Sequence, residues 1–189
     1  MRWLLIGQPG KVGVQFVSSE FDAPIVKQQL QAHFTEATFV PREYVLQELW
    51  DTCSGEEELV VEFGLGREFM FLLAGSKLDP FVGIVGALAE LQENELACFQ
   101  VMWQFAHHKW AENILNSVTH EDGKPFFVNA PELAKAAENK VAKPLYAAVL
   151  RIATKAATFD RAMQIAGDIA ASLRVFSDPN GNELAVWSE

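Results

Sequence analysis

The sequence predicts an α+β fold made of ferredoxin-like split βαβ units, with an antiparallel or mixed sheet and helices packed on it. The last third of the chain reads as strand, helix, strand, with an apolar run at residues 145–152, a helical pattern at 158–174 and a β-rich run at 184–187. In the first 75 residues, two pairs of β-rich runs are separated by short glycine-containing segments, which predict hairpins. Hairpins exclude a purely parallel sheet.

The elements expected in residues 1–75 follow from apolar periodicity and from turn residues. In chain order they are strands at 3–6 and 12–17, a helix after Asp22, a strand at 37–40, a short helix or irregular connection at 41–55, and a second hairpin of 59–63 and 69–73. The helix has Asp22 as N-cap and Pro24 in its first turn, and Val26, Leu30 and Phe34 recur on one apolar stripe.

The elements expected in residues 76–189 follow from the same signals. They are a helix opened by Asp79-Pro80, a strand at 96–105, helices at 107–118 and 131–141, a strand at 145–152, a helix at 158–174 and a strand at 184–187. The helix at 158–174 is expected to pack on the sheet through a stripe of Phe159, Met163, Ala166, Ala170 and Leu173.

The strand at 145–152 has apolar residues on both faces, which predicts a central strand. The spacing of all these elements is compatible with two modules, residues 1–75 and 76–189, and also with one merged sheet. The sequence alone does not distinguish these two arrangements.

The charge balance argues against direct nucleic-acid binding. The chain has 25 acidic and 15 basic residues and a net charge of −10, which would repel a phosphate backbone. Cys53 and Cys98 have no C-x-x-C partner and are expected to be buried free thiols of a reducing compartment. The apolar run at 81–89 is far shorter than the roughly 20 residues that span a bilayer. We therefore expect a cytoplasmic protein, and a place in a complex beside a membrane is compatible with this.

Glycine-rich segments are expected to be turns. In Gly7-Gln8-Pro9-Gly10-Lys11-Val12, two residues separate the glycines and Val12 follows the lysine, whereas a phosphate-binding loop needs four residues there and a Ser or Thr. Gly64-Leu65-Gly66 lacks the third glycine of a dinucleotide fingerprint and is likewise expected to be a turn. No cofactor-binding residue is assigned.

The histidine cluster is the only set of side chains that suggests a metal. It consists of His107 and His108 with Trp110, Glu112 and His120. Adjacent histidines on a helix point about 100° apart, which makes joint ligation of one ion difficult. We therefore assign no catalytic and no metal-binding residue, and a metal-dependent enzyme using His107 and His108 is the least favoured alternative.

Two blocks of residues carry a resemblance to a known family across residues 77–187. The first is Lys77-Leu78-Asp79-Pro80-Phe81-Val82-Gly83-Ile84-Val85-Gly86-Ala87-Leu88, and the second includes Lys143-Pro144-Leu145-Tyr146, Arg161-Ala162 and Gly181-Asn182-Glu183-Leu184. They resemble the N-terminal, pre-ATPase region of conjugation and type IV secretion DNA-transfer proteins, the VirD/TraG and HerA-like P-loop ATPases. The resemblance implies a role in assembly. It supplies no catalytic residue, because the ATP-hydrolysing residues of that family lie in a later domain and no Walker motif occurs here.

We expect a non-catalytic assembly or protein-interaction domain, the N-terminal part of a DNA-transfer or secretion ATPase or a stand-alone relative. Its partner would be another protein or a second copy of the chain, with no direct contact to nucleic acid. The alternative from a different class is a small-ligand-binding regulatory domain, since ferredoxin-like sheets host many functions. A pocket in the structure would favour that alternative, although the sequence identifies no ligand.

Overall fold

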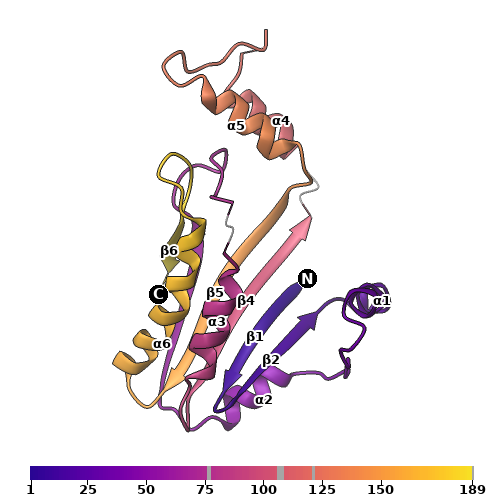
Figure 1. Ribbon diagram of the computed structural model, residues 1–189, viewed down its shortest axis with the longest axis vertical. Helices are drawn as coiled ribbons and strands as arrows, with labels where there is room; N and C mark the ends of the chain where they lie inside the picture. Colours follow the sequence, from indigo (N-terminus) through magenta and orange to yellow (C-terminus); the bar gives the residue numbers. More distant parts are fainter. Residues whose placement is uncertain (76–77, 106–108, 121, 189) are drawn as a thin grey trace.

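The protein contains an open six-stranded sheet in which neighbouring strands are antiparallel (Figure 1). The computed structural model describes residues 1–75, 78–105, 109–120 and 122–188. The strands are β1 (Arg2–Gln8), β2 (Lys11–Val17), β3 (Glu57–Leu65), β4 (Leu96–Phe105), β5 (Tyr146–Ala156) and β6 (Leu184–Ser188). Their order is β2-β1-β4-β5-β3-β6, so β2 and β6 form the two edges. The predicted α+β class is confirmed.

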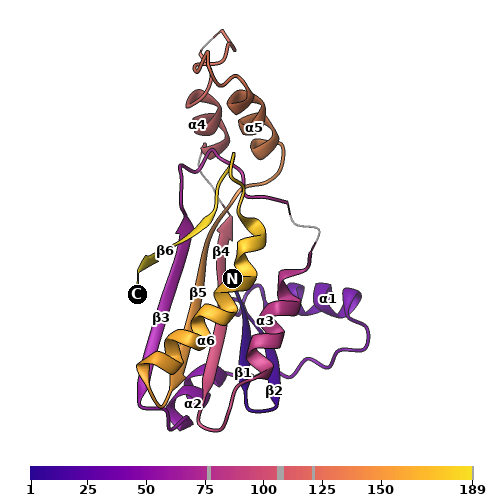
Figure 2. The same ribbon diagram turned by 60° about the vertical axis from the view of Figure 1, so that its left-hand side comes forward.

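Helices cover the sheet unequally (Figures 1 and 2). They are α1 (Ala23–His33), α2 (Val45–Thr52), α3 (Pro80–Ala89), α4 (Trp110–Asn116), α5 (Glu132–Val141) and α6 (Phe159–Ala171), which continues into the 3-10 turn η1 (Ser172–Phe176). Helices α3 and α6 lie side by side on one face, and α4 and α5 stand together beyond one end of the sheet. In the described part of the chain, no helix combines the length and the apolar character that a membrane crossing requires.

The main core lies between the sheet and the pair α3 and α6. Alternate residues of a strand point to opposite faces, so Leu5 of β1 enters this core while Leu4 and Ile6 contact α2 on the other face. The buried side chains of the main core include Leu59, Val61, Phe63, Ile84, Leu88, Phe99, Ile152, Ile165, Ile169 and Leu173. The sheet therefore has one well-covered face and a second face that α2 contacts through a smaller cluster.

The order of elements is compatible with a split βαβ arrangement. The chain runs β3-α3-β4-β5-α6-β6, and these four strands lie in the order β4-β5-β3-β6. The hairpin of β1 and β2 extends the sheet beyond β4, and α4 and α5 form an insertion between β4 and β5. The expected modules, residues 1–75 and 76–189, share this one sheet, because β3 lies between β5 and β6. β5 is a central strand, as predicted.

The N-cap predicted for α3 is present, whereas the N-cap predicted for α1 is not. Asp79 caps α3, since its carboxylate accepts a hydrogen bond from the Phe81 amide at 2.9 Å. Thr158 caps α6 in the same way. Asp22 makes no side-chain cap bond, and instead its carboxylate accepts a hydrogen bond from the Ser19 hydroxyl at 2.7 Å.

The predicted second hairpin is wrong, because residues 69–73 are not a strand. Both edges of β3 are occupied by distant strands, β5 and β6, which leaves no free edge for the following segment. That segment is a loop held by Asn182, a fully buried residue whose amide nitrogen donates to the carbonyls of Arg67 and Glu68. The pairing of β3 with β5 and β6, together with the buried Asn182 amide, thus takes the place of the predicted hairpin.

The turn predicted at Gly64-Leu65-Gly66 is wrong as well, since β3 continues through Leu65. The glycine has a packing role. The Trp187 indole lies against Gly64, and a Cβ at that position would be 2.5 Å from its Cε2 atom. The Trp187 indole nitrogen also donates to the Leu65 carbonyl at 3.2 Å. Glycine at 64 thus permits the indole to lie across the edge of the sheet.

The segment between β2 and β3 also departs from expectation. Residues 37–40 are not a strand, while the undecided connection contains α2. The chain leaves the sheet after β2, so residues 37–40 have no neighbouring strand to pair with. The stripe of α1 is not buried either: Val26 and Leu30 are half-buried and Phe34 is 58% exposed.

The buried stripe of α6 is rotated from the predicted one. Its core residues are Ala162, Ile165, Ala166 and Ile169, whereas Phe159 and Met163 are 50% and 40% exposed. Small side chains let the helix backbone approach β5 closely, so that the Thr154 hydroxyl donates to the Ala162 carbonyl at 3.1 Å. The buried face of α6 thus combines two alanines with two isoleucines, and it shares Ala166 with the predicted stripe.

Candidate functional site

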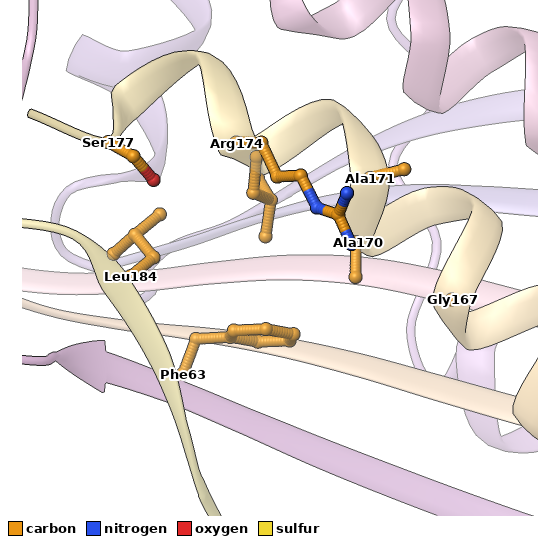
Figure 3. Close-up of a pocket in the computed structure, with 8 residues that line it drawn as sticks. Phe63, Gly167, Ala170, Ala171, Arg174, Ser177 and Leu184 are labelled. Carbon is orange, nitrogen blue, oxygen red and sulfur yellow. The ribbon is translucent and has the colours of Figure 1, made fainter.

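A half-open pocket of about 250 Å³ lies between the end of α6 and the strands β3 and β6 (Figure 3). It is lined by Phe63, Gly167, Ala170, Ala171, Leu173, Arg174, Ser177 and Leu184. These residues supply one cation, one hydroxyl, and no carboxylate or imidazole. The charged and hydrogen-bonding groups of the lining are therefore the side chains of Arg174 and Ser177.

The floor of the pocket is apolar and belongs to the main core. Phe63 is 6% exposed and Leu173 is 3% exposed. The Phe63 ring lies below the last turns of α6, with Leu184 of β6 beside it (Figure 3). An apolar group in this space would contact packed side chains that are already held in place.

Arg174 supplies the charge of the pocket. Its guanidinium lies back along the helix beside Ala170 and Ala171 (Figure 3). Other arginines form ion pairs, such as Arg151 with Glu62 and Arg161 with Glu95, whereas Arg174 has no ion pair with any described residue. Its charge is thus available to a bound anion.

Gly167 widens the pocket at the middle of α6. Glycine inside a helix costs about 1 kcal/mol relative to alanine. No atom lies within 4 Å of the position that a Cβ would occupy, so packing does not require a glycine here. A glycine inside a helical pattern is the one sequence signal for this site. The prediction missed it, together with Arg174 and Ser177, because the pocket joins the end of α6 to Phe63, which lies on a strand far earlier in the chain.

The histidine cluster falls partly outside the described residues, which do not include His107 and His108. In the described remainder, Glu112 is ion-paired with Lys109 at 3.1 Å, and the His120 ring stacks on Phe126 with a centroid distance of 4.5 Å. No three metal-capable side chains gather in the described part of the chain. Glu112 and His120 are thus engaged in contacts within the same part of the chain.

Both cysteines are free thiols, and only Cys98 is buried, whereas burial was expected of both. Cys98 is buried under α2, and burial raises the pKa of its thiol to about 12. Cys53 is half-buried, and its thiol donates to the Asn94 carbonyl at 3.4 Å. A thiol with so high a pKa as that of Cys98 is a poor nucleophile near neutral pH.

A second candidate site is the tip of the α4 and α5 hairpin, which we define as Phe126, Phe127 and Val128. These consecutive side chains are 54%, 45% and 86% exposed. They belong to the segment between α4 and α5, and these two helices lie at the end of the molecule opposite α2 (Figures 1 and 2). The tip is accessible to a partner without obstruction by the sheet.

No family model matches the chain, and comparison with curated proteins and with solved structures finds no significant similarity. Interpretation of the two candidate sites therefore rests on their geometry.

Proposed function

We propose that this chain is a non-catalytic protein-interaction domain that contacts its partner through the hairpin tip. The observation that carries the proposal is the exposure of Phe126, Phe127 and Val128 together at the end of a protruding element. Single exposed apolar residues are common, but adjacent ones in a prominent position are typical of binding surfaces. Aromatic side chains, phenylalanine among them, are also enriched at protein interfaces relative to the rest of the surface.

The tip is ordered by its own contacts, which supports the proposal. The Phe126 amide donates to the Val118 carbonyl at 2.7 Å, and the His120 amide donates to the Lys124 carbonyl at 2.9 Å. Stacking of the His120 ring on Phe126 adds to this order. A surface that is ordered before binding loses less conformational entropy on association.

The charges around the tip favour a protein partner over an anionic membrane. Residues 119–132 contain the acidic Glu121, Asp122 and Glu132 but only one basic residue, Lys124. Lys124 is already ion-paired with Asp122 at 2.9 Å. Anionic lipids repel acidic residues. We therefore expect the partner to be a protein with an apolar pocket that is bordered by basic residues.

Site-specific photo-crosslinking tests the proposal. A benzoylphenylalanine is placed at Phe127, and, as a matched control, at Phe159, another exposed phenylalanine that lies on α6. In lysate of the source cells we expect a discrete adduct at position 127 and none at 159. An excess of the protein without the crosslinker should compete for the partner and abolish the adduct. An excess of the triple variant Phe126→Ser, Phe127→Ser, Val128→Ser should leave the adduct unchanged. Equal adducts at both positions, or none at 127, would contradict the proposal.

We further propose that the interaction belongs to a DNA-transfer or secretion assembly. The support for this is the resemblance of residues 77–187 to the pre-ATPase region of the VirD/TraG and HerA-like ATPases. Reading the source gene past the codon for Glu189 tests it. A G-x-x-x-x-G-K-[ST] motif within the next few hundred codons is the expected result, and an immediate stop codon would remove the interpretation of this chain as part of an ATPase.

A further inference from the structure

We infer that the pocket between α6 and the strands β3 and β6 binds a monocarboxylate with a short apolar tail. The carboxylate would pair with Arg174, and the tail would lie on Phe63 and Leu184. This inference uses a different part of the molecule from the hairpin tip, so either proposal can fail without the other.

The size and lining of the pocket favour a short apolar tail. A pocket of about 250 Å³ is slightly smaller than the roughly 300–1,000 Å³ of drug-sized ligand sites, so it suits a small ligand. The buried side chains of Phe63 and Leu173 offer an apolar surface, and Leu184 is half-buried beside them. A short aliphatic tail, such as the roughly seven carbons that octanoate carries beyond its carboxylate, suits this volume and this chemistry.

The charges around the pocket favour a carboxylate as the head group of the ligand. The guanidinium of Arg174 presents its donors in a planar fork that matches the two oxygens of a carboxylate. No acidic residue lines the pocket, and the Asp178 carboxylate, near in sequence, accepts a hydrogen bond from the Asn180 amide at 2.9 Å. The end of a helix carries partial negative charge, so an anion there depends on the arginine.

Gly167 provides a way to close the pocket, with a matched control in α3. Both Gly167 and Gly86 are exposed glycines inside helices, and at neither would an added Cβ have an atom within 4 Å. Only Gly167 lines the pocket. Leucine at 167 would occupy the space of the tail, whereas leucine at 86 would project from α3 into solvent.

Titration with octanoate, followed by the amide signals of the protein in NMR spectra, tests the inference. We expect shifts at Phe63, Leu184 and residues 167–177. The variant Arg174→Leu should weaken binding by about twofold to fivefold, the range expected for an ion pair made by an exposed guanidinium. Gly167→Leu should abolish binding, and Gly86→Leu should leave it unchanged. Because Arg174 is exposed, its replacement should not affect folding, and Arg174→Gln serves as a second variant.

Two further ligands sharpen the result. Octanamide has the same tail without the charge, so equal binding of octanamide and octanoate would overturn the role of Arg174. Unchanged octanoate affinity in Arg174→Leu, or no shifts in the pocket, would overturn the inference as well. A short peptide ending in leucine, with a free or an amidated C-terminus, distinguishes a protein C-terminus from a free acid as the source of the carboxylate. Binding of the free peptide alone, lost in Arg174→Leu, would assign the pocket to a protein C-terminus.

Discussion

The main core under α6 and the small core between α4 and α5 differ in where their contacts come from. The main core joins strands and helices from residue 5 to residue 173. The small core consists of Ile114, Val118, Ala134 and Ala137, all from one insertion. Regions with few long-range contacts open at lower free energy than the global core. We therefore expect the sheet to unfold as one unit and the hairpin to open by itself.

Truncating one isoleucine in each core is expected to give the largest effect and to separate the two units. Ile169→Ala removes a fully buried side chain of α6 and should destabilise the whole protein by about 2–5 kcal/mol in chemical denaturation. Ile114→Ala removes a residue that is 1% exposed in the hairpin. Its effect should appear as faster hydrogen exchange in α4 and α5 alone. Equal losses of global stability would show one cooperative unit.

Removing the ionic tie of α6 is expected to have the next largest effect. Arg161 donates to both carboxylate oxygens of Glu95, at 2.7 and 2.9 Å, and the Glu95 side chain is only 8% exposed. Arg161→Met should cost about 1.5–3 kcal/mol, because it leaves a buried carboxylate without its charged partner. The more exposed pair of Arg151 and Glu62 is the control, and Arg151→Met should cost about 1 kcal/mol or less. The reverse order would contradict the assignment.

Replacing Gly7 by alanine tests how closely α3 and the residues after it approach β1. A Cβ there would lie 2.8 Å from Leu91 Cδ1 and 2.9 Å from Leu88 Cβ. Gly7→Ala should therefore destabilise the protein by about 1–3 kcal/mol through overpacking. Gly13 of β2 is the control, since its nearest neighbour to a Cβ is a backbone oxygen at 3.9 Å. A thermal melt of both variants compares them directly, and matched melting temperatures would refute the close approach.

Acid should weaken the main core through Glu95. Hydrogen bonds from Arg161 lower the pKa of the Glu95 carboxyl, against the opposing effect of burial. A carboxyl whose pKa is lower in the folded state binds fewer protons there than in the unfolded state. Its contribution is fully present above the ordinary pKa of 4.5 and is lost as the pH falls through the lowered value. The unfolding free energy of Glu95→Gln, measured from pH 7 to pH 3, should fall less than that of the wild type. Parallel curves would exclude this role.

The smallest effect is expected where α5 is tied to the loop that follows β3. The Lys140 ammonium donates to the carbonyls of Phe69 and Phe71, and burial lowers the pKa of this lysine. Lys140→Met should release the hairpin with a loss of about 0.5–1.5 kcal/mol. Hydrogen exchange should quicken in α4 and α5 and remain unchanged in α6. A uniform acceleration across both regions would place Lys140 within the main unit.

The fold could be predicted well where local signals agree. Asp79 and Pro80 start α3 as expected, and the Pro9-Gly10 turn with its positive φ at Gly10 joins β1 and β2. Apolar periodicity was insufficient by itself for α1, because it predicted the helix but not whether another element covers its apolar face. Thus an apolar stripe was predicted for α1, and the helix is present, yet α1 contains no buried residue.

The candidate sites could be predicted only in part. The helix at 131–141 was expected, but the exposure of Phe126 and Phe127 depends on the hairpin standing away from the sheet. The pocket depends on β3 and β6 meeting the end of α6. Neither arrangement has a local signal, because each is created by contacts between distant segments.

Local sequence specifies most of the helices and strands, since caps, turn residues and apolar periodicity act within a few neighbouring residues. Long-range contacts establish which strands pair, which face of α6 is buried and where Arg174 lies. They place β3 between β5 and β6, although both of these strands come much later in the chain. The physical reason is that strand pairing and close packing are satisfied over the whole molecule at once, so a local preference such as the second hairpin is lost when distant strands occupy both edges of β3.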